Sequence, residues 1–151
     1  MDTESYTRKI VGSVSVYKRQ SVDVLCPKAP VRIPGQTSVR EAISLMLEHQ
    51  TGSVLVESDG KLAGIFSERD VLNDVSRDLS QLDDAVENHM TPSPATITKN
   101  DSIAYAMHTM DVGGYRHLPV VDSQRIPTGI VSSRDIMRFL CVRYAQSRSA
   151  E

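Results

Sequence analysis

The sequence predicts an α/β (α+β) fold made of two tandem copies of one βαββα unit, related by an approximate two-fold axis. Three observations predict it: an eight-residue string occurs twice, strand-like and helix-like apolar patterns follow in the same order in both halves, and aliphatic residues run through the whole chain. A unit of about 60 residues is marginally stable alone. We therefore expect two small mixed sheets, packed with helices, to share a core.

The repeated string is GIFSERDV at residues 64–71 and GIVSSRDI at residues 129–136, with five of eight positions identical. Upstream, PVRI at 30–33 matches PATI at 94–97. Such a repeat indicates a duplicated structural unit. The expected organisation is an N-terminal extension at 1–21, a first unit at 22–80, a second unit at 81–146 and a tail at 147–151.

Local signals place the elements of each copy in one order: a short entry strand, a helix, two strands and a final helix. Ser38-Val39-Arg40-Glu41 is a capping box that begins the first helix. Asp101 or Ser102 is placed to cap the matching helix. The expected strands are 31–33, 53–56 and 62–66 in the first copy and 95–98, 118–121 and 129–131 in the second, and the final helices begin at Ser67 and Ser132.

The connections between strands also carry signals. Asp59-Gly60 is a strong hairpin signal between the two strands of the first copy, and a longer loop at 122–128 serves the second. Before the first unit, Val11, Val14 and Val16 are compatible with an extra strand or with a dimer-forming segment, and the sequence leaves both open.

The composition excludes several classes of protein. The net charge is -2, from 17 basic and 19 acidic residues that are well mixed, so no basic face for nucleic acid is expected. No apolar run is long enough to cross a bilayer, and the N-terminus has no targeting pattern. The distant Cys26 and Cys141 predict a reduced, cytoplasmic chain, with Cys141 in the core.

Catalytic and metal signatures are also missing from the sequence. The four histidines have no metal-ligand spacing with one another or with cysteine. The sequence contains no nucleophile elbow, phosphate-binding P-loop or His-Glu-x-x-His motif. We therefore expect neither an enzyme nor a metal site, and we assign the helical methionines to the core or to a dimer interface.

The two strand-to-helix junctions have two possible roles. Ser-x-x-Asp, at Ser67 to Asp70 and at Ser132 to Asp135, is a helix-capping pattern. The alternative is ligand binding: the preceding glycine permits a close approach by a ligand, the helix start attracts anions, and a carboxylate can accept hydrogen bonds from ribose hydroxyls. Because the longer string repeats, we favour ligand binding.

These junctions resemble those of a pair of cystathionine β-synthase (CBS) domains, also called a Bateman module. The entry string Met90-Thr91-Pro92 and the string RHLPVVD at 116–122 are similar to the same family, and the resemblance covers roughly residues 22–145. It implies an adenosine nucleotide bound between the two units. It assigns the ribose to Asp70 and Asp135, further hydroxyl contacts to Ser67 and Ser132, the adenine to Ile65 and Ile130, the phosphates to Arg116 and His117, and the completion of the Asp135 pocket to Thr37 and Ala42.

The two expected pockets differ. Thr51 and Gly52 stand where the second copy has Arg116 and His117, and Asp101 stands where the first copy has Thr37. Missing cations and an added carboxylate disfavour a phosphate. We therefore expect the Asp135 pocket to be the stronger one and the Asp70 pocket to be weak, empty or suited to a less charged ligand.

Two arginines inside the repeated strings, Arg69 and Arg134, have two readings. They reach the phosphates as bidentate donors, or they are solvated arginines on a helix surface.

The expected function is that of a regulatory sensor without a cofactor of its own. It would bind AMP, ADP, ATP or an NAD(H)-type ligand, form a homodimer as the resemblance implies, and signal to an effector protein in trans. The alternative is a purely structural dimerisation or interaction module with an empty cleft.

Overall fold

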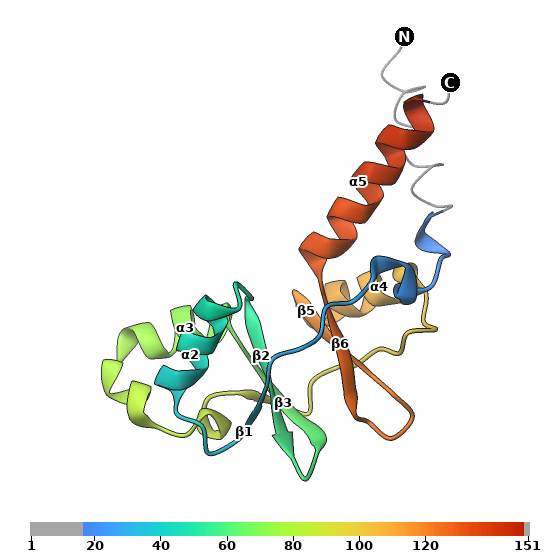
Figure 1. Ribbon diagram of the computed structural model, residues 1–151. Coiled ribbons are helices and arrows are strands. Elements are labelled where there is room, and N and C mark those ends of the chain that lie inside the picture. The colour runs from blue at the N-terminus through green and yellow to red at the C-terminus, as the bar shows by residue number, and fades with distance from the viewer. Residues whose placement is uncertain (1–16, 150–151) are drawn as a thin grey trace.

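The computed structural model describes residues 17–149, so the expectation for Val11, Val14 and Val16 lies outside the described residues. Figure 1 shows two units side by side, with the last helix projecting from the second. In chain order the elements, with η for a 3-10 helix, are η1 (Val22–Leu25), β1 (Arg32–Pro34), α2 (Val39–Glu48), β2 (Ser53–Ser58), β3 (Lys61–Ser67), α3 (Glu68–Asn73), η2 (Val75–Arg77), η3 (Leu79–Asp83), η4 (Val86–Asn88), β4 (Thr91–Pro92), α4 (Ile103–Gly113), β5 (His117–Val121), β6 (Pro127–Ser132) and α5 (Ser133–Ser149).

Both sheets are small, as predicted, but only the first is mixed. In the first unit the strand order is β1-β2-β3-β4, with β1 parallel to β2 and the other neighbours antiparallel. In the second unit β5 and β6 form an antiparallel pair. The strand expected at 95–98 is wrong: only a single parallel bridge joins Ile97 to Val120 there.

The local signals act as predicted. The Ser38 hydroxyl accepts the Glu41 N–H at 3.1 Å and begins α2. Of the two candidates for α4, Ser102 is the cap, since its hydroxyl accepts the Tyr105 N–H at 3.0 Å. Asp59 and Gly60 have φ of 53° and 76°, the left-handed conformation that a two-residue hairpin turn requires.

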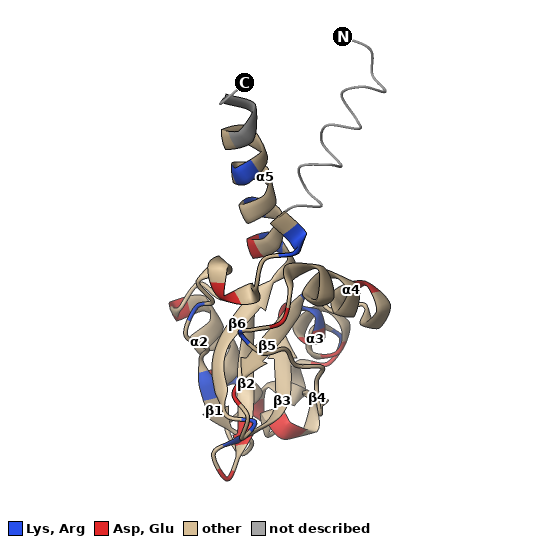
Figure 2. Ribbon diagram, turned by 90° about the vertical axis from the view of Figure 1, so that its right-hand side faces the viewer, with Lys and Arg blue, Asp and Glu red and all other residues tan. Residues whose placement is uncertain are grey.

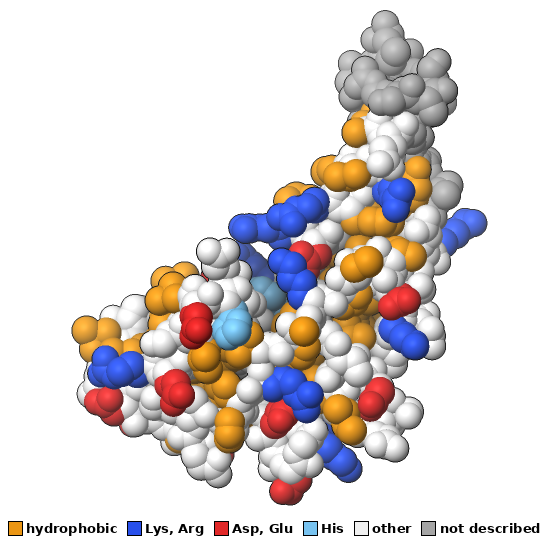
Figure 3. Space-filling model, in the orientation of Figure 1, with side chains coloured by type: hydrophobic (Ala, Val, Ile, Leu, Met, Phe, Trp, Pro, Cys, Tyr) orange, Lys and Arg blue, Asp and Glu red, His pale blue; other side chains and the backbone are white. Residues whose placement is uncertain are grey.

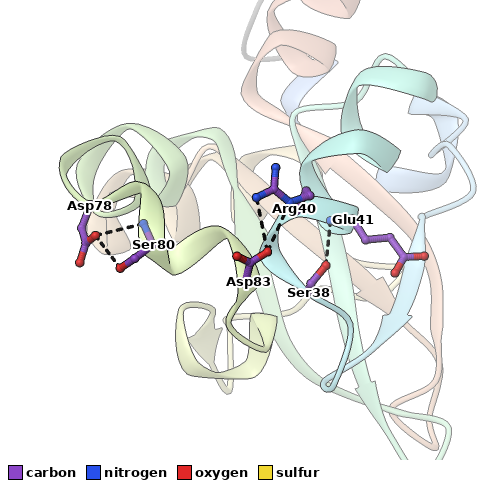
Figure 4. Close-up of polar contacts among 6 residues, drawn as sticks. All are labelled: Ser38, Arg40, Glu41, Asp78, Ser80 and Asp83. Atoms are coloured by element: carbon purple, nitrogen blue, oxygen red, sulfur yellow. Dashed lines mark hydrogen bonds and ion pairs between the residues drawn. The ribbon is translucent and has the colours of Figure 1, made fainter.

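The polar link at residues 77–86 is folded. It forms η3, in which the Asp78 carboxylate accepts the Ser80 N–H at 3.1 Å and the Ser80 hydroxyl at 2.6 Å (Figure 4). Arg40 on α2 contacts the Asp83 carboxylate at 3.4 Å, which ties the link to the first helix. The link therefore belongs to the packed structure of the first unit.

The two units exchange their entry segments. β4, near the start of the second unit, pairs with β3 of the first, while Lys28, near the start of the first unit, bridges to Ile130 on β6. A Cβ on Gly64 would lie 2.9 Å from the Thr91 carbonyl oxygen, and one on Gly129 would lie 2.8 Å from Pro27 Cβ. Our explanation of these glycines by ligand approach is wrong, because the chain's own exchanged segments take that space.

Three clusters of buried side chains form the core. Two of them centre on one unit each and are completed by Val22 and Val86 from the exchanged segments, and the third is shared. The shared cluster consists of Leu55, Leu62 and Ile65 from the first unit and Val121 from the second, with Ile130 packed against it. It confirms that the small units share apolar packing.

The surface differs in one respect from what the sequence predicts. Figure 2 shows acidic and basic residues interspersed over the ribbon, without a basic face. Cys141, expected in the core, is exposed on α5, where it lines a surface hollow with Met107 and Met110 of α4. Within residues 17–149, no helix combines the length and apolarity that crossing a membrane would need.

Candidate functional site

Both strand-to-helix junctions form helix caps. Asp70 Oδ2 accepts the Ser67 N–H at 2.8 Å and the Ser67 hydroxyl at 3.4 Å. In the second unit, Asp135 Oδ2 accepts the Ser132 N–H at 2.9 Å, and the Asp135 N–H donates to the Ser132 hydroxyl at 3.1 Å. Each aspartate uses Oδ2 for its cap. Within the described residues, Oδ1 of each is left to accept another hydrogen bond.

A cavity of about 330 Å³, which we call the Asp70 cleft, opens at the first junction. It is bounded by both units, since residues 115–117 come from the segment that leads into β5 and residues 65–73 from β3 and α3. Figure 3 shows basic and histidine side chains gathered at the hollow between the two units. The cleft is lined by Ile65, Ser67, Glu68, Arg69, Asp70, Leu72, Asn73, Thr91, Tyr115, Arg116 and His117.

The expected division of cations between the two pockets is wrong. Arg116 and His117 line the Asp70 cleft, which therefore does not lack basic groups. The reason is the absence of a side chain at Gly52: a Cβ there would lie 3.1 Å from His117 Nε2. Gly52, from which we predicted a weak Asp70 pocket, instead leaves room there for His117 of the second unit.

Burial shifts the pKa of two side chains in the cleft, Asp70 and His117. Desolvation by burial raises the pKa of Asp70 above its usual range, although the hydrogen bonds from Ser67 lower it. Desolvation also lowers the pKa of His117, although the carboxylates of Glu68 and Asp135 raise it. At neutral pH the cleft therefore presents a neutral imidazole.

The second junction opens on a different cavity, also of about 330 Å³, which we call the basic cavity. It lies between the segment at 24–28 and α5, and Asp135 is the single residue of the expected Asp135 pocket that lines it. Arg116 and His117 line the Asp70 cleft instead, and Ala42 lines neither cavity, although the Asp135 carboxylate is near enough to act on His117. The basic cavity is lined by Val24, Leu25, Cys26, Pro27, Lys28, Val131, Asp135, Arg138, Phe139, Val142, Arg143 and Gln146.

Two residues expected in the Asp135 pocket, Thr37 and Ala42, make contacts within the fold of the first unit and its link. Ala42 is fully buried in the core of the first unit, because it lies on the same helical stripe as Val39 and Met46. Its expected place in a ligand pocket is wrong. Thr37 lines neither cavity, and its carbonyl accepts the Val86 N–H at 2.7 Å.

The remaining expected residues lie near the junctions and line neither of these two cavities. Thr51 is half-buried, and its hydroxyl donates to the Ser53 carbonyl at 3.3 Å. Ile130 packs against the shared core, and Arg134 is exposed on α5. These residues, together with Ser132, are absent from the linings of the Asp70 cleft and the basic cavity.

Sequence reasoning missed Glu68 and Tyr115 in the cleft. Glu68 is one of the positions at which the two repeated strings differ, with Ser133 as its counterpart, and that difference was an available signal. Tyr115 precedes the basic pair, but nothing in its local sequence indicates the cleft. Among residues 17–149, no three His, Cys, Asp or Glu side chains are grouped so that they could hold a metal ion.

The family is established by comparison with known sequences. A model of the CBS domain matches the chain twice, at residues 22–77 and 84–142. The chain therefore belongs to the CBS-domain family, as a tandem pair.

Curated relatives share this region and extend beyond it. The chain is 36% identical over 104 residues to the uncharacterized 17.7 kDa protein in the bps2 3' region of Acidianus ambivalens, a match that covers 68% of this chain and 62% of that protein. It is 31% identical over 115 residues to the L-aspartate semialdehyde sulfurtransferase of Methanosarcina acetivorans, with 76% of this chain and 22% of the enzyme covered. The match thus spans less than two thirds of either relative.

Solved structures confirm the fold. Protein NE2398, a CBS domain structure, has a TM-score of 0.75 at 28% identity, with 81% of this chain and 98% of that chain covered. The CBS domain pair of protein MJ0100, in complex with 5'-methylthioadenosine and S-adenosyl-L-methionine, has a TM-score of 0.73 at 26% identity, covering 82% and 98%. CBSX2 in complex with AMP has a TM-score of 0.68 at 25% identity, covering 81% and 96%.

Proposed function

We propose that this chain is a non-enzymatic regulatory module that binds an adenosine ligand in the Asp70 cleft and signals that binding to a partner protein. One observation carries the proposal. Ser67 and Asp70 of the first unit share a cavity with Arg116 and His117 of the second. The ligands named for CBSX2 and for the MJ0100 pair all contain adenosine, which supports this ligand class.

The cleft offers one contact for each part of such a ligand. Asp70 Oδ1 can accept a ribose hydroxyl while Oδ2 keeps its cap. Ile65, at the edge of the shared core, provides an apolar wall for the base. Arg69 and Arg116 provide donors for a phosphate or carboxylate.

The charge of the cleft favours a ligand of low charge. The carboxylates of Glu68 and Asp70 offset the guanidinium groups of Arg69 and Arg116, and His117 is neutral at neutral pH. A triphosphate would meet two carboxylates in a partly desolvated space, where repulsion is stronger than in water. AMP and adenosine thioethers or sulfonium compounds fit this balance better than ATP or a dinucleotide.

Signalling requires that the ligand favour one arrangement of the two units over another. A ligand in the cleft contacts α3 of the first unit and the start of β5 of the second, so their relative position affects its affinity. We include in this proposal a homodimer formed through the apolar hollow of about 460 Å³ on α4 and α5, which Met107, Met110, Ile136, Met137 and Leu140 line. The exposed free thiols of Cys26 and Cys141 agree with a reducing, cytoplasmic setting.

One observation favours the alternative, a structural interaction module without a ligand. Both aspartates accept hydrogen bonds from their own helix caps, which is all that a purely structural role would require. The distinction therefore depends on whether the Asp70 cleft takes a ligand.

Calorimetric titration with AMP, 5'-methylthioadenosine and S-adenosylmethionine separates the two functions. A ligand at about 100 times its dissociation constant raises the free energy of unfolding of the chain by ~2.7 kcal/mol. A thermal melt should then show a melting temperature higher by roughly 5–11 °C. Asp70→Asn should weaken binding, and the matched control Asp135→Asn, with the same cap in the other copy, should not. No heat and no melting shift with any of the three at millimolar concentration would support the structural alternative.

A further inference from the structure

His117 lies where the two units meet in the Asp70 cleft. It begins β5 of the second unit and is half-buried, and its Nε2 lies 3.1 Å from the point that a Cβ on Gly52 of the first unit would occupy. The first unit has Gly52 itself at the matching position, so this imidazole occurs once in the pair of units. Of the residues that line the cleft, His117 is the one whose ordinary pKa, 6.5, lies near neutral pH.

The charged groups that act on His117 come from both units. Burial lowers its pKa, while Glu68 on α3 and Asp135 on α5 favour the charged ring and Arg116, the preceding residue, opposes it. Ser132 of β6, its partner in the strand register, and Gly52 carry no charge. Because burial outweighs the two carboxylates, the pKa of His117 lies below 6.5 and the ring of the free chain is neutral at pH 7.

The other charges that line the cleft are balanced. Glu68 and Asp70 supply two carboxylates. Arg69 and Arg116 supply two guanidinium groups. One added proton on the imidazole therefore changes the cleft from balanced to positive. In a partly desolvated space, that single charge acts on a phosphate more strongly than it would in water.

We propose that His117 couples ligand choice to proton concentration: the cleft takes up AMP together with one proton on the His117 imidazole, and takes up an uncharged adenosine ligand without one. This inference rests on the proposed function and names a regulation of the same site. The proton comes from the solvent when AMP binds and returns to it on release. Protonated His117 donates to the phosphate beside Arg116, since both side chains line the cleft.

The direction of the pH dependence follows from the charges. A phosphate dianion beside the ring favours its charged form, so the pKa of His117 is higher in the AMP complex than in the free chain. Between these two pKa values the complex binds more protons than the free chain, and AMP therefore binds more tightly as the pH falls. An uncharged ligand such as 5'-methylthioadenosine has no such effect. The preference for AMP therefore grows in mild acid.

NMR titration of the histidine ring signals of the full chain tests the proposal directly. The pKa of His117 should be higher with saturating AMP than without ligand, and saturating 5'-methylthioadenosine should leave it unchanged. Calorimetry in two buffers of different ionisation enthalpy, PIPES and ACES, measures the same proton uptake, because the buffer supplies the proton. The affinity for AMP should rise from pH 7.5 to pH 6.5 by up to about tenfold, the limit for one proton per pH unit.

His117→Gln removes the titrating group and keeps a side chain that can form hydrogen bonds. Its proton balance on AMP binding should reflect only the AMP phosphate, since a phosphate monoester itself titrates at a pKa of about 6. His108→Gln is the matched control, because His108 is exposed on α4 and lines neither the Asp70 cleft nor the basic cavity. This control should take up protons as the wild-type chain does.

The outcomes separate this inference from the proposed function. AMP binding without a change in the pKa of His117, or with equal proton uptake in wild type and His117→Gln, would overturn the coupling alone. Loss of the uptake in His108→Gln would assign the proton to another site and also overturn it. If 5'-methylthioadenosine binds and AMP does not at either pH, only this inference fails; if neither binds, the proposed function fails with it. The NMR titration uses the unaltered chain, so it decides even where a variant is unstable.

Discussion

His117 of the second unit and Glu68 of the first converge over Gly52. His117 Nε2 and Glu68 Cδ lie 3.1 Å and 3.3 Å from the point that a Cβ on Gly52 would occupy. The Gly52 carbonyl also accepts the Glu68 N–H at 3.0 Å, which fixes the start of α3 beside the histidine. A glycine in one copy thus allows an acid and an imidazole from different units to face the same cleft.

The burial of His117 predicts a loss of stability in mild acid. Its pKa in the folded chain is below the ordinary 6.5, so between these two values the unfolded chain binds more protons. The stability contributed by neutral His117 is fully present above pH 6.5 and is lost as the pH falls toward the folded-state pKa. Urea unfolding at pH 7.5 and pH 5.5 should show this decrease, and His117→Gln should reduce it. A pH dependence that is identical in the variant would contradict the prediction.

Glu68 should set the charge preference of the Asp70 cleft. Glu68→Gln removes a carboxylate that faces the incoming phosphate, so AMP should bind about fivefold more tightly, since a like charge nearby costs on the order of 1 kcal/mol. S-adenosylmethionine, which carries a sulfonium, should gain nothing. Calorimetry measures both, with Glu48→Gln, exposed at the end of α2, as the control. Equal gains for both ligands would rule out a charge effect.

Two substitutions at Asp70 should separate capping from ligand binding. Asp70→Ala removes the acceptor for the Ser67 N–H and should cost about 0.5–2 kcal/mol of stability. Asp70→Asn keeps an acceptor oxygen and removes a carboxylate whose ionisation burial disfavours, so its stability at pH 7 should stay near wild type. Both variants should bind AMP weakly. Denaturant titration measures the stability, and AMP binding by Asp70→Asn at wild-type affinity would refute a role of the carboxylate in binding.

The exchange of entry segments should make Gly64 sensitive to any side chain. A Cβ there would clash with Met90 and with the Thr91 carbonyl, so Gly64→Ala should destabilise the chain by about 1–3 kcal/mol. Gly52→Ala is the comparison, since its close neighbours are the ends of side chains that can move. Melting temperatures measure the difference. A smaller loss at Gly64 than at Gly52 would contradict the packing of β4 on β3.

Met137 should report on the proposed dimer. It lines the apolar hollow on α4 and α5 and is 60% exposed in a single chain. Met137→Lys would bury a charge in the proposed interface and should give a monomer in analytical ultracentrifugation, while Arg134→Ala on the same helix should not. A wild-type chain that sediments as a monomer at all concentrations would exclude this interface.

Short-range patterns in the sequence were sufficient to predict much of the fold. The caps at Ser38 and Ser102 and the turn at Asp59-Gly60 depend on hydrogen bonds and φ angles within three or four residues, which residue identity determines. The repeated string likewise identified both strand-to-helix junctions. Each of these features is decided before distant parts of the chain meet.

Only the tertiary structure decided which residues share a site. The family resemblance implied that Arg116 and His117 are partners of Asp135, but in the structure both residues line the Asp70 cleft. Likewise, Gly64 serves the exchanged segment rather than a ligand, and Ala42 is in the core. The physical reason is that the register between segments tens of residues apart depends on how two apolar surfaces fit together, and no pattern within one segment carries that information.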